Sequence, residues 1–280
     1  MVKVRSIKRF LAALLGIALV GGAIWFSIHS IRERQSTKLM NTYLQEIISM
    51  LSLPTSPHFH QRLDKVRTFI NDHSKHKIDE AFLANRGNSV LYAAGLIAHA
   101  KNASLEPVHM ECSTRSNVMA RILEAMGYET RIVAIFNTKS NLNTHSYLEV
   151  LDPDTGRWET QDADYDIYWR GKESRGRISL ADAAEDIEDI EPCGRESCGW
   201  DHVSREGIKA KKLREFLDII SITDKQRGIR YALYTSRADL NRLYSKARKQ
   251  GTFCQAEAKR CKQGFYDIRI FSSYVAGQPR

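Results

Sequence analysis

The sequence has no internal repeat, no low-complexity segment and no strong excess of one charge beyond its N-terminus. Of its 280 residues, 42% are hydrophobic and 27% are charged, which is enough apolar material for a sizeable core and excludes a wholly disordered chain. Six of the 42 Lys and Arg residues, but only one of the 33 Asp and Glu residues, lie within residues 1–34, so the remainder carries a net charge of +4. That charge is too small to indicate nucleic-acid binding, and no nucleic-acid partner is expected.

Cysteine is scarce, and four of the five cysteines fall into two close pairs. Cys193 and Cys198 stand in CGRESC, and Cys254 and Cys261 stand in CQAEAKRC, whereas Cys112 is alone. This arrangement favours two disulfides and one free thiol in an oxidising compartment. The connectivity stays open, because four cysteines allow three pairings.

A metal site is the alternative use of these cysteines. Cys193, Cys198 and His202 read as C-x4-C-x3-H, a spacing that matches no common zinc module. The histidines His58 and His60 form an H-x-H pair, but no carboxylate or cysteine accompanies them at a convincing metal-binding spacing. The sequence therefore predicts no metal site and no cofactor.

Charged residues are absent from Phe10–Ile28, a run of 19 residues. As a helix this run would be about 28 Å long at about 1.5 Å per residue, which matches the hydrocarbon thickness of a membrane. A cleaved signal peptide is the alternative, with VGGA as its cleavage site, but the apolar run continues past that point. We therefore expect an uncleaved anchor of a single-pass inner membrane protein, with the rest of the chain on the periplasmic side.

Apolar periodicity and turn residues divide the middle of the chain into helices followed by strands. The periodicity predicts helices in the segments 31–53, 60–74, 88–102 and 112–126. Strands are predicted at 131–136, 145–150 and 157–162, the last two joined by the turn LDPDTG. Helices followed by antiparallel strands indicate an α+β fold.

The C-terminal part, residues 176–280, is expected to be a helical extension stapled by disulfides. The acidic segment 179–191 is expected to be a helix or loop, and 205–222 an amphipathic helix. The basic segment 237–264 is expected to be a helical hairpin or one long helix.

Three residues have the chemistry of a nucleophile, a base and a residue that orients the base. Cys112 opens a predicted helix, where the helix N-terminus favours a thiolate. The turn between the two strands brings Asp162 opposite or next to His145 in an antiparallel register. Two of the three residues are therefore neighbours through hairpin geometry, and the helix has to present the third. Three aromatic residues, Tyr165, Tyr168 and Trp169, follow Asp162 in DYDIYWR. We expect them either to line a substrate site or to pack in the core.

The order of these features resembles the transglutaminase-like superfamily, whose members have a papain-type α+β core. The resemblance covers about residues 88–166: a cysteine, a helix that ends in Gly, a strand, a His opening HSYLEV, a turn and WETQD. It implies that Cys112 is the nucleophile, His145 the general base and acid, and Asp162 the residue that orients the imidazole. The implied chemistry is acyl transfer through a thioester.

The residues around the cysteine depart from the family pattern. Many members have Gly two residues before the cysteine and an aromatic residue after it, whereas this chain has Met110 and Ser113. Tyr147 stands where relatives often have Trp. The backbone N–H of Cys112 is expected to be one oxyanion donor, and a second is unassigned. His109, three residues before the cysteine, is a further candidate for the cleft.

The sequence thus predicts a membrane-anchored cysteine hydrolase, a protease, isopeptidase or amidase, acting on a peptide or protein of the cell envelope. The alternatives are a protein cross-linking transglutaminase and a non-catalytic binding module for a cell-envelope partner. The expected domains are an anchor at 1–30, a helical stem at 31–57, a transglutaminase-like catalytic domain at 58–175 and the C-terminal extension.

Overall fold

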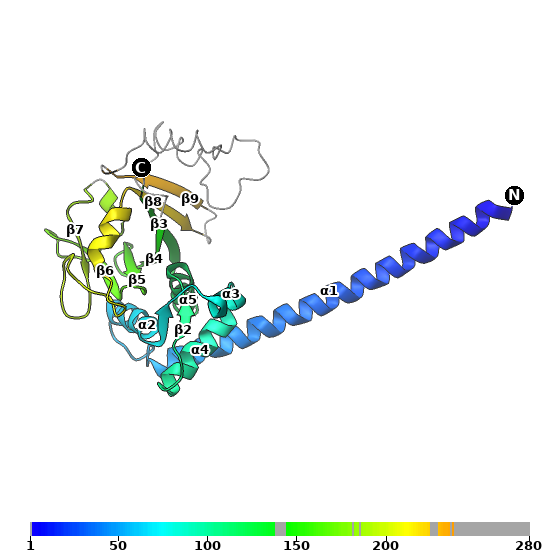
Figure 1. The fold of residues 1–280 in the computed structure, drawn as a ribbon, viewed down its shortest axis with the longest axis horizontal. Coiled ribbons are helices and arrows are strands. Elements are labelled where there is room, and N and C mark those ends of the chain that lie inside the picture. The colour runs from blue at the N-terminus through cyan, green and yellow to red at the C-terminus, as the bar shows by residue number, and fades with distance from the viewer. Residues whose placement is uncertain are drawn as a thin grey trace.

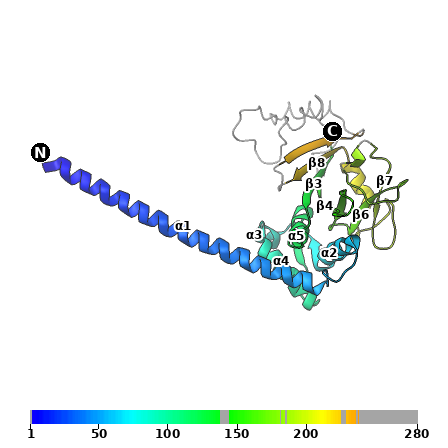
Figure 2. The same cartoon turned by 180° about the vertical axis from the view of Figure 1, so that it is seen from behind.

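The computed structural model describes residues 2–137, 144–180, 182–184, 186–224, 229–235 and 237. Its first element, the helix α1 (Val2–Met50), extends from the rest of the molecule as one long rod with the N-terminus at its far end (Figures 1 and 2). In the part of the chain whose side chains are described, no helix combines the length and the apolar composition that a membrane crossing requires. The predicted span Phe10–Ile28 lies in α1 almost entirely outside that part.

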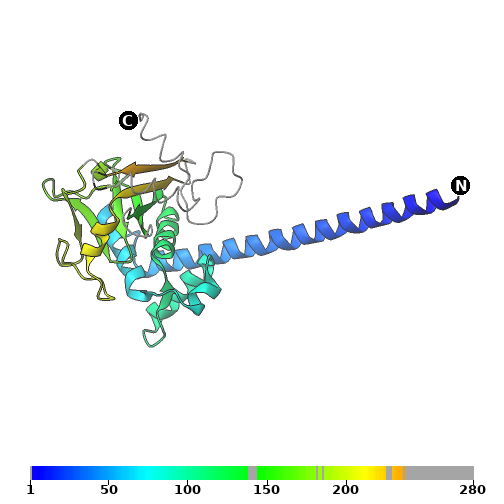
Figure 3. The ribbon, with the colours of Figure 1, turned by 45° about the horizontal axis from the view of Figure 1, so that its top comes forward.

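Four helices gather around the inner end of α1, and the sheet lies beyond them (Figure 3). They are α2 (Phe59–His73), α3 (Glu80–Asn85), α4 (Ser89–Lys101) and α5 (Cys112–Glu124). The predicted helices at 60–74, 88–102 and 112–126 are thus confirmed, because their apolar stripes find partners in one another and in α1. Two short strands in this layer, β1 (Ser74–His76) and β2 (Val108–Met110), pair with each other in parallel.

The main sheet has seven strands in the order β7-β6-β5-β4-β3-β8-β9, and every neighbouring pair is antiparallel. The strands are β3 (Thr130–Phe136), β4 (Thr144–Leu151), β5 (Trp158–Asp162), β6 (Ile167–Gly171), β7 (Ile190–Cys193), β8 (Ile219–Asp224) and β9 (Ile229–Tyr234). The three strands predicted from the sequence, β3 to β5, are confirmed, and they pair in the order of the chain. The helix α5 packs on β4 and β3. Helices packed on an antiparallel sheet give the mixed α/β architecture that the sequence predicts.

Side chains of the sheet contribute to two apolar clusters. Leu148 and Val150 of β4 belong to a cluster formed mainly by the helices α1, α2, α4 and α5. Tyr147, at an alternating position of β4, belongs to a second cluster with Val133 and Trp169. Because successive side chains of a strand point to opposite faces, the same strand serves both clusters.

The prediction of a helical C-terminal extension is wrong for its described residues. The predicted amphipathic helix 205–222 is a short 3-10 helix, η2 (Ala210–Phe216), followed by the strand β8. The acidic segment 179–191 holds a single 3-10 turn, η1 (Asp182–Ala184), and then enters β7. Four of the five residues from Ile219 to Thr223 are β-branched, which favours an extended strand once β3 offers a pairing edge. Tertiary pairing therefore overrides the helical periodicity. Strands from both sides of the expected boundary at residue 175 therefore share one sheet.

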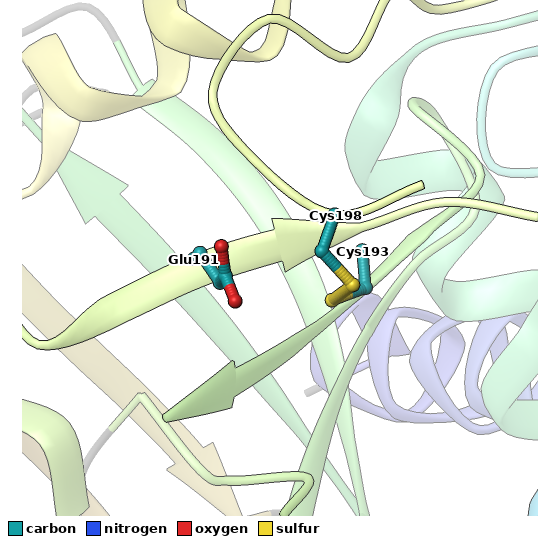
Figure 4. A group of neighbouring side chains, drawn as sticks. All are labelled: Glu191, Cys193 and Cys198. Atoms are coloured by element: carbon teal, nitrogen blue, oxygen red, sulfur yellow. A yellow bond between two sulfur atoms is a disulfide. The ribbon is translucent and has the colours of Figure 1, made fainter. Parts of the chain in front are cut away.

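One of the expected disulfides is present. Cys193 and Cys198 are bonded, and Figure 4 shows the bond beside Glu191, which precedes Cys193 on β7. These three residues come close enough together for a metal ion, but a disulfide leaves no thiolate to bind one. The second pair, Cys254 and Cys261, and the basic segment from residue 238 onward lie outside the described residues.

We expect that replacing Leu63 of α2 by Ala lowers the free energy of unfolding by about 2–5 kcal/mol, because the side chain is wholly buried among the helices. Leu83 of α3 is 56% exposed, so Leu83→Ala should change this free energy by less than about 0.5 kcal/mol. Urea unfolding followed by circular dichroism measures both. Equal losses in the two variants would contradict the helical layer described above.

Candidate active site

The cysteine predicted as a nucleophile opens the helix α5. The chain enters from β2, and Glu111 at the N-cap has an extended backbone with φ −97° and ψ 169°. The helix then begins at Cys112, whose side chain is partly exposed. The first N–H groups of any helix have no acceptor within it, so those of Cys112 and Ser113 point toward the space before the helix. A negative charge placed there is stabilised by these groups and by the helix dipole.

The predicted base and its partner are in contact. His145 Nε2 lies 2.9 Å from Asp162 Oδ2, and both side chains are buried. Leu148 pairs with Gln161, so Asp162 lies at the level of Tyr147, two residues along from His145. Asp162 is therefore diagonal to His145 rather than directly opposite, and the contact forms because positions two apart on one strand share a face.

Asp162 is held in place through its other oxygen. The backbone N–H groups of Asp164 and Tyr165 both donate to Asp162 Oδ1, at 2.7 and 3.2 Å. These bonds come from the bend between β5 and β6. The carboxylate is thus oriented by backbone groups and presents Oδ2 to the imidazole.

Cys112 reaches the same imidazole. Cys112 lies close enough to the ring for its charge and a side-chain hydrogen bond to be among the causes that raise the pKa of His145. Asp162 engages the ring through Nε2. The hydroxyl of Ser116 lies 2.9 Å from the carbonyl of Cys112 and 3.1 Å from that of Ser146, so one side chain links the first turn of α5 to β4 beside His145. The structure thus brings together the three residues that the sequence singled out.

The pKa of His145 is raised well above its ordinary value. Burial alone would lower it, but the charge of Asp162, the charge of Cys112 and the hydrogen bonds to both side chains raise it by more. The imidazolium form is therefore favoured in the folded protein, next to the sulfur. A cation in that position is the condition under which a cysteine acts as a thiolate.

Aromatic rings surround the imidazole. Tyr147 and Tyr165 meet the ring of His145 edge-on, with centroids 4.8 and 5.4 Å away. Burial and the neighbouring Asp162 raise the pKa of both phenols, which therefore stay neutral. Trp169 is fully buried against Tyr147 and Trp200, so it packs in the core and does not form an open substrate wall.

A second buried carboxylate, that of Asp164, lies next to His145 and was not identified from the sequence. Asp164 Oδ2 lies 4.0 Å from His145 Nδ1. Its carboxylate is already engaged, because Oδ1 accepts from Arg115 at 2.7 Å and lies 2.8 Å from His76 Nδ1. Burial raises the pKa of Asp164, but the hydrogen bond from His76 and the charges of His145 and Arg115 outweigh it and lower the pKa. The charged form of Asp164 is therefore favoured beside the imidazole.

This network extends to Glu206, whose Oε1 accepts from Arg115 at 2.9 Å and from the backbone N–H of His76 at 3.2 Å. Asp164 is two residues from a predicted site residue, which is the one signal that could have identified it. Arg115, His76 and Glu206 come from segments far apart in the sequence, and no local motif connects them.

A hollow of about 440 Å³ adjoins Tyr165. Residues of both charges line it, including Asp72, Asp201, Arg195 and Arg205. The loop closed by the disulfide forms one wall, where Arg195 lies 2.6 Å from Asp72 and also pairs with Asp166. The hollow is therefore a polar surface next to the aromatic ring that borders His145.

Two other histidines from the sequence analysis have structural partners. His109 lies 2.9 Å from Asp79 and 3.2 Å from Glu106, so it belongs to a surface group of charges. His202 Nε2 lies 3.2 Å from the carbonyl oxygen of Tyr165. Neither contact involves the sulfur of Cys112.

Comparisons with known proteins add little to this geometry. No protein-family model matches the chain, and no curated protein matches it. A solved structure described as "Crystal structure of a TGase" has 16% sequence identity and a TM-score of 0.31, over 44% of this chain and 31% of that one. A similarity at that level supports no argument about fold or activity.

We expect Asp162→Asn to lower the pKa of His145, because the imidazolium loses the largest of its stabilising charges. Titration of the ring protons by NMR measures this. The wild-type ring should remain protonated above pH 6.5 and lose its proton at a lower pH in the variant. Asp154→Asn, on the exposed turn of the same hairpin, should leave the titration unchanged. An unchanged pKa of His145 in Asp162→Asn would contradict the contact.

Proposed function

We propose that this protein is a thiol enzyme of the transglutaminase-like type, which transfers an acyl group from an amide through a thioester on Cys112. The observation that supports the proposal is the chain of contacts from Cys112 to His145 to Asp162, at the N-terminus of α5. A nucleophile, a base within hydrogen-bond reach and a third group that orients the base are the parts such catalysis needs.

Each residue has one task in the proposed reaction. The Cys112 thiolate attacks the carbonyl carbon of an amide, and a C–S bond forms while the carbonyl oxygen becomes an oxyanion. His145 then donates its proton to the nitrogen of the leaving amine, the C–N bond breaks and a thioester remains. In the second half, His145 removes a proton from water or an amine, which attacks the thioester and releases Cys112 as a thiolate. Asp162 keeps the ring in the required tautomer throughout.

The N-terminus of α5 supplies the oxyanion donors in this proposal. The backbone N–H of Cys112 is one donor, as the sequence suggests, and the N–H of Ser113 in the same helical turn is adjacent to it. Backbone donors do not depend on side-chain identity. The departures at Met110 and Ser113 from the family pattern therefore leave this function intact.

Hydrolysis is the proposed outcome, because water is the default acceptor unless a site excludes it. Cross-linking to a second amine is the alternative within the same chemistry. The substrate we propose is a peptide or protein, and the polar hollow beside Tyr165 is a suitable place for its polar groups. A papain-like binding module without activity would use the same hollow but would not need an imidazolium beside a thiol.

We also propose that the enzyme works in an oxidising compartment outside the cytoplasm, anchored by its N-terminal helix. The Cys193–Cys198 disulfide supports the compartment, since such bonds are rare where glutathione keeps thiols reduced. The uncharged run Phe10–Ile28 supports the anchor.

Thiol labelling tests whether Cys112 is activated by His145. At pH 6 iodoacetamide should modify Cys112 at least about ten times faster in the wild type than in His145→Ala, because only the wild type has an imidazolium beside the sulfur. At pH 9 the difference should shrink, since an unassisted cysteine ionises near pH 8.5. Mass spectrometry has to assign the modified residue, because the sequence contains further cysteines.

His109→Gln is the matched control for this experiment. It removes a histidine three residues from Cys112 that pairs with Asp79 and Glu106 instead. Its labelling rate should equal that of the wild type. Equal rates in the wild type and His145→Ala at pH 6 would overturn the proposed activation.

Activity can be tested with a glutamine-containing model protein and a dansylated primary amine. Fragments or free ammonia report hydrolysis, and covalent fluorescence reports transfer to the amine. We expect hydrolysis to dominate, and Cys112→Ala to lower either activity by at least about 1,000-fold. Arg121→Gln, an exposed change in the last turn of α5, should keep full activity. Activity that survives in Cys112→Ala would refute the thioester route.

A further inference from the structure

Three potential metal ligands meet near the turn that joins β4 to β5, at the end of the hairpin away from His145 and Asp162. His60 lies in the first turn of α2, Asp152 directly follows β4, and Glu159 lies near the start of β5. One ligand atom from each lies within 4.8 Å of the others. No local motif connects these residues, because Asp152 and Glu159 are more than 90 residues away from His60.

The buried carboxylate of Glu159 is incompletely satisfied. Glu159 is 4% exposed, and its Oε1 lies 2.7 Å from His60 Nε2. Its other oxygen, Oε2, is buried and has no hydrogen-bond partner among the described residues. A buried carboxylate oxygen without a partner is costly, which is the situation that a bound cation relieves.

The nearby guanidinium of Arg177 does not fill this role. Arg177 Nη2 donates to Asp64 at 2.7 Å. Its other terminal nitrogen, Nη1, is buried and has no hydrogen-bond partner among the described residues. Arg177 therefore does not satisfy the second oxygen of Glu159.

Asp152 is oriented toward the group by its own turn. Its Oδ1 accepts from the backbone N–H of Asp154 at 2.9 Å, and its Oδ2 accepts from the hydroxyl of Thr155 at 2.8 Å. Each carboxylate oxygen can accept more than one bond, so both retain a lone pair for a metal. Supporting hydrogen bonds of this kind are typical of metal ligands.

We propose that His60, Asp152 and Glu159 bind a divalent transition-metal ion, for which Zn²⁺ is the best match. One imidazole and two carboxylates form a donor set that Zn²⁺ accepts, whereas Ca²⁺ and Mg²⁺ prefer oxygen ligands alone. Half of the His60 side chain is exposed, which gives an ion access and lets the ring move aside to admit it between the ring and Glu159. Water from solvent completes the coordination.

The ion would join the first turn of α2 to the turn of the hairpin. It would lie at the opposite end of β5 from Asp162, so it is a structural site that takes no part in bond making. It would also fix the hairpin that contains both His145 and Asp162.

The test uses the full chain in detergent, without a histidine tag, freed of metal with a chelator. Isothermal titration with Zn²⁺ should show one site of high affinity in the wild type. His60→Gln and Glu159→Gln should each weaken that site at least about tenfold. Thermal unfolding should shift upward on adding Zn²⁺ in the wild type and much less in either variant. Ca²⁺ and Mg²⁺ should produce no comparable shift.

His58→Gln is the matched control, because His58 is exposed and lies two residues away, outside the cluster. This variant should bind Zn²⁺ like the wild type. Absence of a high-affinity site in the wild type, or equal affinity in the wild type and His60→Gln, would overturn the proposal and leave His60 and Glu159 as a simple hydrogen-bonded pair. The readout is binding, so the result does not depend on the proposed acyl transfer.

Discussion

The 2.9 Å contact between His145 Nε2 and Asp162 Oδ2 is the interaction on which the candidate site depends. It orients the imidazole, and it contributes to the raised pKa of the ring. The contact is itself a result of hairpin register, since a shift by one residue would move Asp162 to the other face of the sheet. The turn sets that register: Gly156 adopts a φ of +67°, and the N–H of Asp152 bonds to the carbonyl of Arg157.

Features encoded locally could be predicted from the sequence. The apolar stripe of α5, the glycine that ends it and the Asp-Pro-Gly turn between β4 and β5 are all short-range signals, and they were enough to bring His145 and Asp162 together. The strand β8 was missed because its isoleucines also fit a helical stripe, and its strand state depends on pairing with β3, which lies some 90 residues earlier. Arg115 and Asp164 were missed for the same kind of reason: their ion pair joins a helix to a loop without any local motif.

Several charges are buried together around the imidazole, and their arrangement explains how they coexist. Buried ions are costly unless each one has both a partner and hydrogen bonds. Asp162 has two backbone N–H groups and His145, whereas Asp164 has Arg115 and His76. Each carboxylate is thus satisfied by a separate set of donors. This division of partners keeps two acids within reach of one ring without making them compete for it.

The thiol alone would not indicate an enzyme, because an isolated cysteine on an apolar helix stripe is ordinarily a core residue. Here the same helix turn provides backbone donors, Ser116 ties that turn to β4, and Asp162 and Cys112 both raise the pKa of the buried imidazole. Packing needs none of these three features, since an apolar side chain would fill the same space without burying charge. Charges that are costly to bury and are nevertheless grouped around one partly exposed sulfur therefore support the proposed chemistry at Cys112.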